Sequence, residues 1–474
     1  GVVSLKNTTG GGNIAIRDSN GLILSSVEMD SLAGGSFTIT AATSPTDSTG
    51  LTQLVGTTIT TGTGNITISV TGAGVTLNNP DNDFNGTVTL TNTGAFPVGI
   101  TNGSGKGLLT FATVSTGDDF AATADAITLT STLTTSIPNA GTVTLNATSG
   151  LLTINAGANL NTGGDVRLTG FTGISTAGNV TTNNANVDFF SPVTLTGNVV
   201  INTGAGLGNI KFSSLVQGTS TGSQSLTLTA GTGDITFTGA LGTPAINLGA
   251  ITINSAKNVS ASATINAASF RQIAGTGTTT FEGAQIYSTV AGLNVKTNSI
   301  TLNNTVDTAG AAVLGVVTLN ADGGVGGGIL TILAGANISS SGAVSLTGAS
   351  GISTGGTVST LNGNVTMSAT SQLITLTIGA NITANGNVLF TANSASGGIT
   401  TDGSITTTGG GTVVMNTTGV LNIQSNADIV SDGLVSFLGG LGIRTAGNVT
   451  TTNDNVDYLS DTTLLGNVVI NTAA

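Results

Sequence analysis

The sequence predicts an all-β protein, namely a right-handed parallel β-helix (β-solenoid) of about 20 to 24 coils. Three observations favour this fold class. Long segments of the sequence recur at wide spacings. Short segments that alternate apolar and polar residues recur inside them, and Gly, Asn, Ser and Thr fill the intervals between these short segments. The intervals leave room for turns but none for helices.

Two long blocks of the sequence recur. "GNVTTNNANVDFFSPVTLTGNVVINT" (178–203) returns 269 residues later as "GNVTTTNDNVDYLSDTTLLGNVVINT" (447–472), identical at 19 of 26 positions. "LTINAGANLNTGGDVRLTGFTGIST" (152–176) returns 178 residues later as "LTILAGANISSSGAVSLTGASGIST" (330–354), identical at 16 of 25 positions. Both spacings are close to multiples of about 90 residues, so the chain is an array of degenerate repeats.

A shorter motif recurs within the long unit: a glycine, any residue, then an alternating apolar triplet. Examples are "GTVTL" at Gly141, "GLLTI" at Gly150, "GDVRL" at Gly164, "GNVVI" at Gly197, "GNIKF" at Gly208, "GDITF" at Gly233, "GILTI" at Gly328, "GAVSL" at Gly342 and "GNVLF" at Gly386. Alternation with period two indicates a strand with one buried face. The residues expected to point inward and stack like on like are Val143 and Leu145, Leu152 and Ile154, Val166 and Leu168, Val193 and Leu195, and Val199 and Ile201. Thr144, Thr153 and Thr194 should point outward.

Short strands of one polarity can satisfy each other by coiling, so that every strand pairs with its equivalent one coil away. Coils of about 20 to 25 residues, stacked about 4.8 Å apart, would give a rod on the order of 100 Å long. The right-handed sense follows from the usual chirality of parallel connections. The alternative is a string of antiparallel β-sandwich domains of about 90 residues. It is less favoured because these strands resemble one another.

We expect two regions along the chain: residues 1–50 as a less regular start or cap, and residues 51–474 as one continuous solenoid. The first region interrupts the motif with "RDSN", "SSVEMDSL" and "SPTDSTG". A second irregular zone, about 245–300, is interpreted as coils with side loops rather than a domain. It contains Lys257, Arg271, Glu282, Tyr287 and Lys296.

Composition excludes several classes of protein. Regular Val, Ile and Leu argue against disorder despite 72 glycines, and no apolar run is long enough for a transmembrane helix. The net charge of -12 argues against nucleic acid, which demands clustered Lys and Arg. Cys and His are absent, which excludes disulfides, thiolate metal sites and histidine-based triads. The chain starts without Met, so we expect a processed chain or a piece of a longer one.

The chain offers little catalytic chemistry, and we predict no catalytic, cofactor-binding or metal-binding residue. A polysaccharide-cleaving β-helix would need clustered carboxylates and a nearby Arg or Lys. Arginine occurs only at Arg17, Arg167, Arg271 and Arg444. The acidic groups are Asp118, Asp119 and Asp125; Glu28 and Asp30; and Asp454, Asp457 and Asp461. Each is interpreted as a solvated face or a turn.

Three further features have both a functional and a structural interpretation. Asp188 and its repeat partner Asp457 would be a recurring ligand site or, the favoured interpretation, a copied turn residue. "DNDFNG" (81–86) lacks the spacing and terminal Glu of a calcium loop. Threonine pairs could form a hydroxyl array that binds ice or crystalline polysaccharide, but we expect irregular coil lengths to break its register. These pairs are Thr87, Thr89 and Thr91; Thr194 and Thr196; and Thr236 and Thr238.

Four segments carry a resemblance to a known family: "GNITISVTGAGVTLNN", "GNVTTNNANVDFF", "SASATINAASFRQIAGTGTTTFEGA" and "LNVKTNSITLNN". They resemble the β-helical repeat regions of filamentous-haemagglutinin-like and autotransporter-type bacterial surface proteins, and of giant repetitive outer-surface proteins of cyanobacteria and related environmental bacteria. The resemblance covers most of the chain. It implies a secreted parallel β-helix that serves as an adhesin, stalk or extracellular structural element. The secretion domain and translocator barrel of the full family pattern are not in this sequence.

The function we expect is that of a non-enzymatic extracellular or cell-surface structural β-solenoid. It would build a surface filament, sheath or matrix, or form an adhesin stalk. Both ends of the sequence have the alternating pattern of a strand. This pattern favours end-to-end self-association by strand addition, or a chain that is part of a longer array. A surface or a polysaccharide is the expected kind of ligand, and no cofactor is expected. The alternative is a carbohydrate-processing or carbohydrate- or ice-binding β-helix protein.

Overall fold

The fold is known from a computed structural model, which describes residues 2–30, 33–42, 50–137, 140–310, 314–322, 327–394 and 397–472. Within these residues the regular structure is β-strand without helix, and the strands pair in parallel to form a β-solenoid of about 20 turns. The predicted all-β solenoid is therefore confirmed, and parallel pairing rules out the antiparallel sandwich. The right-handed sense stays a prediction. None of the described residues forms a helix suited to crossing a membrane.

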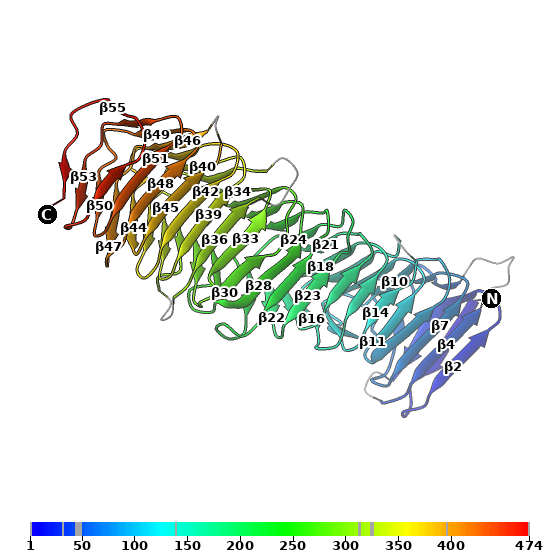
Figure 1. The fold of residues 1–474 in the computed structure, drawn as a ribbon. Helices are drawn as coiled ribbons and strands as arrows, with labels where there is room; N and C mark the ends of the chain where they lie inside the picture. Colours follow the sequence, from blue (N-terminus) through cyan, green and yellow to red (C-terminus); the bar gives the residue numbers. More distant parts are fainter. Residues whose placement is uncertain are drawn as a thin grey trace. The chain divides into compact units, whose positions relative to one another are not determined.

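The chain divides into two compact units: unit 1 comprises residues 1–219 and 223–236, and unit 2 comprises residues 220–222 and 237–474. In each unit, strands from successive coils lie side by side (Figure 1). In unit 1, from β12 onward, each strand pairs with the strand three places later in the chain, so three strands complete one turn. The predicted boundary at residue 50 and the continuity of 51–474 stay predictions.

Three stacks of strands build the regular part of unit 1. The first stack contains β12 (Phe120–Ala124), β15 (Val143–Ala147), β18 (Val166–Gly170), β21 (Val187–Phe189) and β24 (Ile210–Phe212). The second contains β13 (Ala126–Leu129), β16 (Leu151–Ile154), β19 (Gly173–Thr176), β22 (Val193–Leu195) and β25 (Val216–Gly218). The third contains β14 (Leu133–Thr135), β17 (Leu160–Thr162), β20 (Val180–Thr182), β23 (Val199–Asn202) and β26 (Leu226–Thr229).

The less regular first region contributes strands to the same stacks. It contains β1 (Val2–Asn7), β2 (Ile14–Asp18), β3 (Leu22–Met29) and β4 (Phe37–Ala42). β1 pairs with β3 and β2 with β4, both in parallel. β4 then pairs with β7 (Ile66–Thr71), and β7 with β9 (Thr87–Asn92). Most of "SPTDSTG" lies outside the described residues.

Unit 2 has the same construction. The second irregular zone contains β28 (Leu248–Ser255), β30 (Ile265–Gln272), β31 (Thr278–Phe281), β32 (Gln285–Tyr287) and β33 (Leu293–Thr297), in agreement with coils and side loops. Later strands used below are β39 (Val344–Gly348), β42 (Val365–Ala369), β45 (Val388–Ala392), β48 (Val413–Thr417), β51 (Val435–Gly439), β52 (Ile443–Thr445), β53 (Val449–Thr451), β54 (Val456–Tyr458), β55 (Thr462–Leu464) and β56 (Ile470–Asn471).

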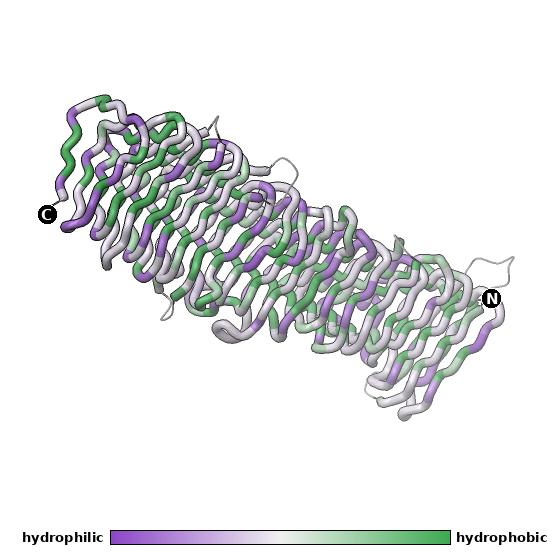
Figure 2. The backbone as a smooth tube through the Cα atoms, in the orientation of Figure 1, coloured by the Kyte–Doolittle hydropathy of each residue, from purple (hydrophilic) through white to green (hydrophobic). Residues whose placement is uncertain are grey.

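Alternation along each strand separates the core from the wall, as the sequence predicts. All ten predicted inward residues are buried, and Thr144, Thr153 and Thr194 are half-buried on the outer side. Hydrophobic and hydrophilic residues accordingly alternate along the backbone in Figure 2. Like residues also stack: Phe189 and Phe212 are in register, with ring centroids 4.7 Å apart and planes at 11°. Such offset stacking adds to the free energy gained by burial.

Asn and Asp ladders hold successive corners together. Asp165 Oδ1 accepts the backbone N–H of Asn186 at 2.8 Å, Asn186 Oδ1 accepts that of Asn209 at 2.9 Å, and Asn209 Oδ1 accepts that of Asp234 at 2.7 Å. Each residue precedes the first residue of its strand, as the second letter of the "GN" and "GD" motifs does. The ladder therefore satisfies backbone groups that a corner would otherwise leave without partners.

Buried threonines complete the corners from inside. The hydroxyl at the end of a strand donates to the carbonyl of a residue in the following turn, as Thr162 does to Gly164 at 2.7 Å and Thr203 to Gly208 at 2.8 Å. Thr354 and Thr401 in unit 2 repeat the arrangement with Gly356 and Gly403. These threonines are buried. A buried hydroxyl without a hydrogen bond would destabilise the fold, and the bond to the turn carbonyl offsets this cost of desolvation.

A glycine pair shapes one corner that recurs with the long repeat. Gly348 ends β39, and a Cβ on it would collide with the carbonyl oxygen of Gly351, whose φ is +125°. Gly170 with Gly173 and Gly439 with Gly442 have the same arrangement. Only glycine fits both positions of each pair. The first has no room for a Cβ, and the second has a positive φ that residues with a side chain rarely adopt.

Candidate functional site

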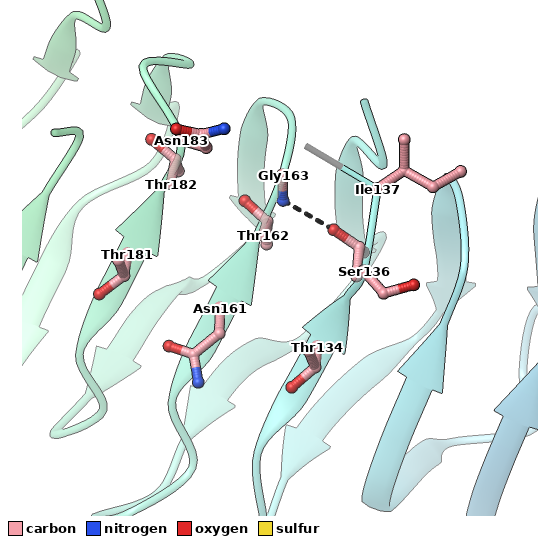
Figure 3. Close-up of a pocket in the computed structure, with 10 residues that line it drawn as sticks. Thr134, Ser136, Ile137, Asn161, Thr162, Gly163, Thr181, Thr182 and Asn183 are labelled. Carbon is pink, nitrogen blue, oxygen red and sulfur yellow. Dashed lines mark hydrogen bonds between the residues drawn. The ribbon is translucent and has the colours of Figure 1, made fainter. Parts of the chain in front are cut away.

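A polar groove crosses three coils of unit 1. It has a volume of about 450 Å³ and lies along the ends of β14, β17 and β20 (Figure 3). Thr134, Asn161 and Thr181 are in register on its floor. Asn161 and Thr181 are exposed and Thr134 is half-buried. The groove thus offers hydroxyl and amide groups one coil apart, a spacing of about 4.8 Å.

The inner hydroxyls of this groove serve the fold. Thr135 Oγ1 donates to the carbonyl of Gly141 at 2.9 Å and accepts the N–H of Gly163 at 2.9 Å. The second of these bonds is the dashed line in Figure 3. Thr162 caps its own corner, as described above. The outward Thr134, Asn161 and Thr181 are therefore available to a ligand, as are the exposed Ser136 and Asn183.

The groove belongs to a longer polar row. Its register runs through Thr40, Ser69, Thr91, Ser115, Thr134, Asn161, Thr181 and Asn202. A second row on the neighbouring stack runs through Thr87, Thr110, Thr128, Thr153, Ser175 and Thr194. The expectation that irregular coil lengths break the register is therefore wrong for these rows. Extra residues are accommodated at the corners and, in β11 (Leu108–Thr116), by a register shift between Phe111 and Val114, so the rows stay aligned.

Asp188 lies in a charged row of unit 1. Arg167, Asp188 and Lys211 are in register on β18, β21 and β24, and Arg167 Nη2 lies 3.4 Å from Asp165 Oδ2. Burial and the nearby Asp165 carboxylate raise the pKa of Asp188 above its usual 3.8, against the opposing effect of Lys211 and Arg167. Charged residues of both signs thus lie on three successive coils, in a chain with only 9 basic and 21 acidic residues.

The favoured interpretation of Asp188 and Asp457 as copied turn residues is wrong, because both lie within strands, β21 and β54. Asp457 is in register with Ser436 rather than with an arginine. The arginine beside Asp188 therefore does not recur with the repeat. Asp188 and Asp457 have different neighbours, so they do not support a ligand site that recurs along the chain.

The other acidic groups are engaged in backbone contacts or lie apart. Asp119 Oδ1 accepts the N–H of Thr142 at 2.7 Å, and Asp125 Oδ2 accepts those of Gly105 and Gly107. Glu28 forms an exposed ion pair with Lys6 at 2.8 Å. The described residues contain no group of three or more acidic, His or Cys side chains placed to hold a metal ion.

The remaining sequence candidates lie at separate places. Arg17, Arg271 and Arg444 are on β2, β30 and β52, and Asp454 and Asp461 are in the turns around β54. "DNDFNG" forms a corner rather than a calcium loop. Its Asn82 is buried and exchanges two amide hydrogen bonds with Gln53, at 2.7 and 2.9 Å, while Phe84 enters the core.

The fold and these surfaces define the class: the chain is a parallel β-solenoid repeat protein. Comparison with protein-family models, with curated proteins and with solved structures found no match. The fold is consistent with β-helical repeat proteins in general. The filamentous-haemagglutinin or autotransporter type stays a resemblance in sequence.

Proposed function

We propose that the protein is a non-enzymatic structural β-solenoid that acts outside the cell, as a building block of a surface filament, sheath or matrix, or as an adhesin stalk. One observation carries this proposal: in each unit the strands of successive coils pair in parallel through the described residues, which is the construction of a β-solenoid. The absence of Cys and the low charge suit a wall held by backbone and amide hydrogen bonds.

The two copies occupy equivalent strands. The internal copy supplies β20 to β23 and the C-terminal copy supplies β53 to β56. β22 pairs with β19 on one side and β25 on the other, and its Leu195 is fully buried. Within the described residues β55 pairs only with β52, and the equivalent Leu464 is 63% exposed. Val469 and Ile470 are likewise exposed.

An open parallel edge that also exposes apolar side chains is a template for another strand. The coil that covers the internal copy indicates what fits there, namely parallel strands with alternating apolar residues such as Ile210, Phe212 and Val216. A second copy of the chain or a continuation of the solenoid would supply such a coil.

Negative-stain electron microscopy across a concentration series of the 474-residue chain tests the proposal. We expect fibres that lengthen with concentration while their width stays constant. Leu464→Lys should abolish them, because it places a charge on the inward side of the edge. Thr463→Lys, the outward neighbour on the same strand, should leave them intact. Single particles at every concentration would overturn the building-block version and leave the stalk.

A second candidate function is binding of a carbohydrate or ice surface, and the long polar rows of unit 1 favour it. Their hydroxyl and amide groups repeat at one coil spacing. Pull-down with insoluble cellulose or chitin, and ice-recrystallisation assays, would test it. Loss of retention in Asn161→Leu would support the groove as the contact. A carbohydrate-processing role is less favoured, because Asp119 and Asp125 already accept backbone N–H groups.

A further inference from the structure

Two exposed phenylalanines, Phe171 and Phe190, lie at the corner that follows β18 and β21 in unit 1. Of the 14 phenylalanines in the chain, eleven are fully buried, whereas Phe171 is 73% exposed and Phe190 is 48% exposed. The backbone N–H of Gly170 donates to Ser191 Oγ at 3.1 Å. These two residues directly precede Phe171 and directly follow Phe190, respectively, so one hydrogen bond between adjacent coils joins the two positions.

The long repeat shows that this corner folds without an aromatic ring. Phe171 corresponds to Ala349 in unit 2, and each lies between the glycines of one pair described above. Both residues donate their backbone N–H to an alanine carbonyl of the preceding coil, at Ala147 and Ala321. Ala349 is only 7% exposed, so a methyl group is enough to fill the corner. The fold therefore gains little from the ring of Phe171, and exposed apolar groups with polar neighbours are typical of a surface that binds something.

Three charged side chains adjoin these phenylalanines on the first stack. Arg167 precedes Phe171 by four residues and is exposed on the outer face of β18. Asp188 precedes Phe190 by two residues and lies on the outer face of β21, in register with Arg167. Lys211 continues the register on β24 and is exposed. The three strands are neighbours in the wall of unit 1 (Figure 1), so the rings and the charges form one surface.

The two cations are the most exposed charges of this surface. The Arg167 side chain is 54% exposed, whereas that of Asp165, its ion-pair partner, is 25% exposed. Asp188 is half-buried between Arg167 and Lys211. The two cations lie two coils apart, about 9.6 Å along the stack. A ligand that approaches from solvent therefore first meets two positive charges beside two apolar rings, although the net charge of the chain is -12.

This combination restricts the chemistry of an occupant. The rings favour a ligand with a flat apolar face, and the cations favour a carboxylate, which a guanidinium can bind through two parallel hydrogen bonds. A hexuronate ring has both features, because its C–H groups form an apolar face and its carboxylate lies at the rim. A peptide cannot add as a strand here, since β18 and β21 each pair with a neighbouring strand on both sides.

We propose that this surface binds hexuronate residues of an acidic polysaccharide. One sugar ring lies against Phe171 and Phe190, its carboxylate accepts hydrogen bonds from Arg167, and its hydroxyls donate to Asp188. A second carboxylate along the same saccharide reaches Lys211. The inference goes beyond the structural role proposed above and does not depend on it. The surface is also separate from the groove of Figure 3, which lies on the third stack.

Fluorescence anisotropy of end-labelled trigalacturonate, titrated with the full chain, tests the inference. The methyl-esterified trisaccharide is the matched ligand control, because it keeps the rings and removes the charges. A triglutamate peptide is the comparison for carboxylates without a sugar ring. We expect saturable binding of trigalacturonate and about tenfold weaker binding of the other two probes, a difference that corresponds to the loss of one charge-assisted hydrogen bond.

Two variants place in unit 1 the residues that unit 2 carries at equivalent positions, so both should fold. They are Phe171→Ala and Arg167→Ser. Each should weaken binding of trigalacturonate severalfold. Phe96→Ala, at the third exposed phenylalanine, and Lys106→Ser, which removes the same charge at an exposed turn, are the matched controls and should leave binding unchanged.

Equal binding of trigalacturonate and its ester, or of trigalacturonate and triglutamate, would overturn the proposal, as would absence of binding to all three probes. Binding that is lost in Asn161→Leu and kept in Phe171→Ala would also overturn it and place the site in the groove of the third stack. Fibre formation is a separate readout, and Phe171→Ala should not change it. Failure of the structural proposal and failure of this inference are therefore distinguishable.

Discussion

At the scale of single residues, polar side chains in this protein act mainly on the backbone of the neighbouring coil. Asp165, Asn186 and Asn209 accept backbone N–H groups, and Thr162 and Thr203 donate to carbonyls. Each such bond contributes about 1 kcal/mol, and its loss would leave a backbone group unpaired at higher cost. The polar side chains of the coils therefore stabilise the contact between neighbouring coils in addition to forming the surface that faces water.

Asp188 is an exception, because burial makes its charged form less stable in the folded protein. Its pKa is raised above 3.8, so the unfolded chain releases this proton first as the pH rises. Ionisation of Asp188 therefore lowers the free energy of unfolding at pH values above about 3.8. Asp188→Asn should stabilise the protein at pH 7 by less than about 1 kcal/mol, since water screens the half-buried group.

Denaturant unfolding at pH 7 and at pH 3 would measure this effect. The gain in Asp188→Asn should disappear at pH 3, where the wild-type carboxyl is protonated. Asp457→Asn, whose neighbour in register is Ser436, is the matched control and should show a smaller change. A variant less stable than wild type at pH 7 would mean that attraction to Arg167 and Lys211 outweighs burial.

At the scale of strands and corners, the glycine pairs set where a coil can bend. Gly348→Ala would force a Cβ onto the carbonyl of Gly351, so the corner must open. We expect a loss of about 1–3 kcal/mol in the free energy of unfolding. Gly310→Ala is the control in the same unit, because nothing lies within 4 Å of its Cβ position. Its effect should stay within about 0.5 kcal/mol. Equal losses in urea titrations would refute this account of the corner.

Strands could be predicted from the sequence because their signal is local. Val199 and Ile201 alternate with outward residues over a few positions, and the pattern needs no knowledge of the neighbouring coil. The ladders could not be predicted in the same way. Asn186 contacts Asn209, which is 23 residues away, whereas Asp165 contacts Asn186, which is 21 residues away. Because the coil length varies, the sequence alone does not show which two residues pair. The motifs "GNIKF" and "GDITF" do show which positions belong to the ladder, because Asn209 and Asp234 are their second residues.

The candidate sites were harder to predict for the same reason. Thr134, Asn161 and Thr181 come from three coils, and their alignment depends on how the corners accommodate extra residues. Contacts between neighbouring coils, whose residues lie far apart in the sequence, decide this groove, and composition or periodicity does not encode those contacts.

At the scale of the whole molecule, a solenoid has a different cooperativity from a globular domain. Each coil contacts the coils before and after it, so stability is close to a sum of local terms. In unit 2, Phe390 is fully buried and in register with Met367 on β42 and Met415 on β48. A substitution at Phe390 should therefore destabilise only these strands and the strands next to them.

Phe390→Ala tests this expectation. Removal of the ring should cost about 3–5 kcal/mol locally, because the neighbouring coils cannot close the cavity. Hydrogen exchange measured by mass spectrometry should accelerate in β42, β45 and β48 while β31, several turns away in the same unit, keeps its protection. Leu389→Ala, at an outward position on the same strand, is 39% exposed and should change little. Uniform acceleration through β31 would mean that unit 2 opens as one cooperative body, and the additive description would then fail.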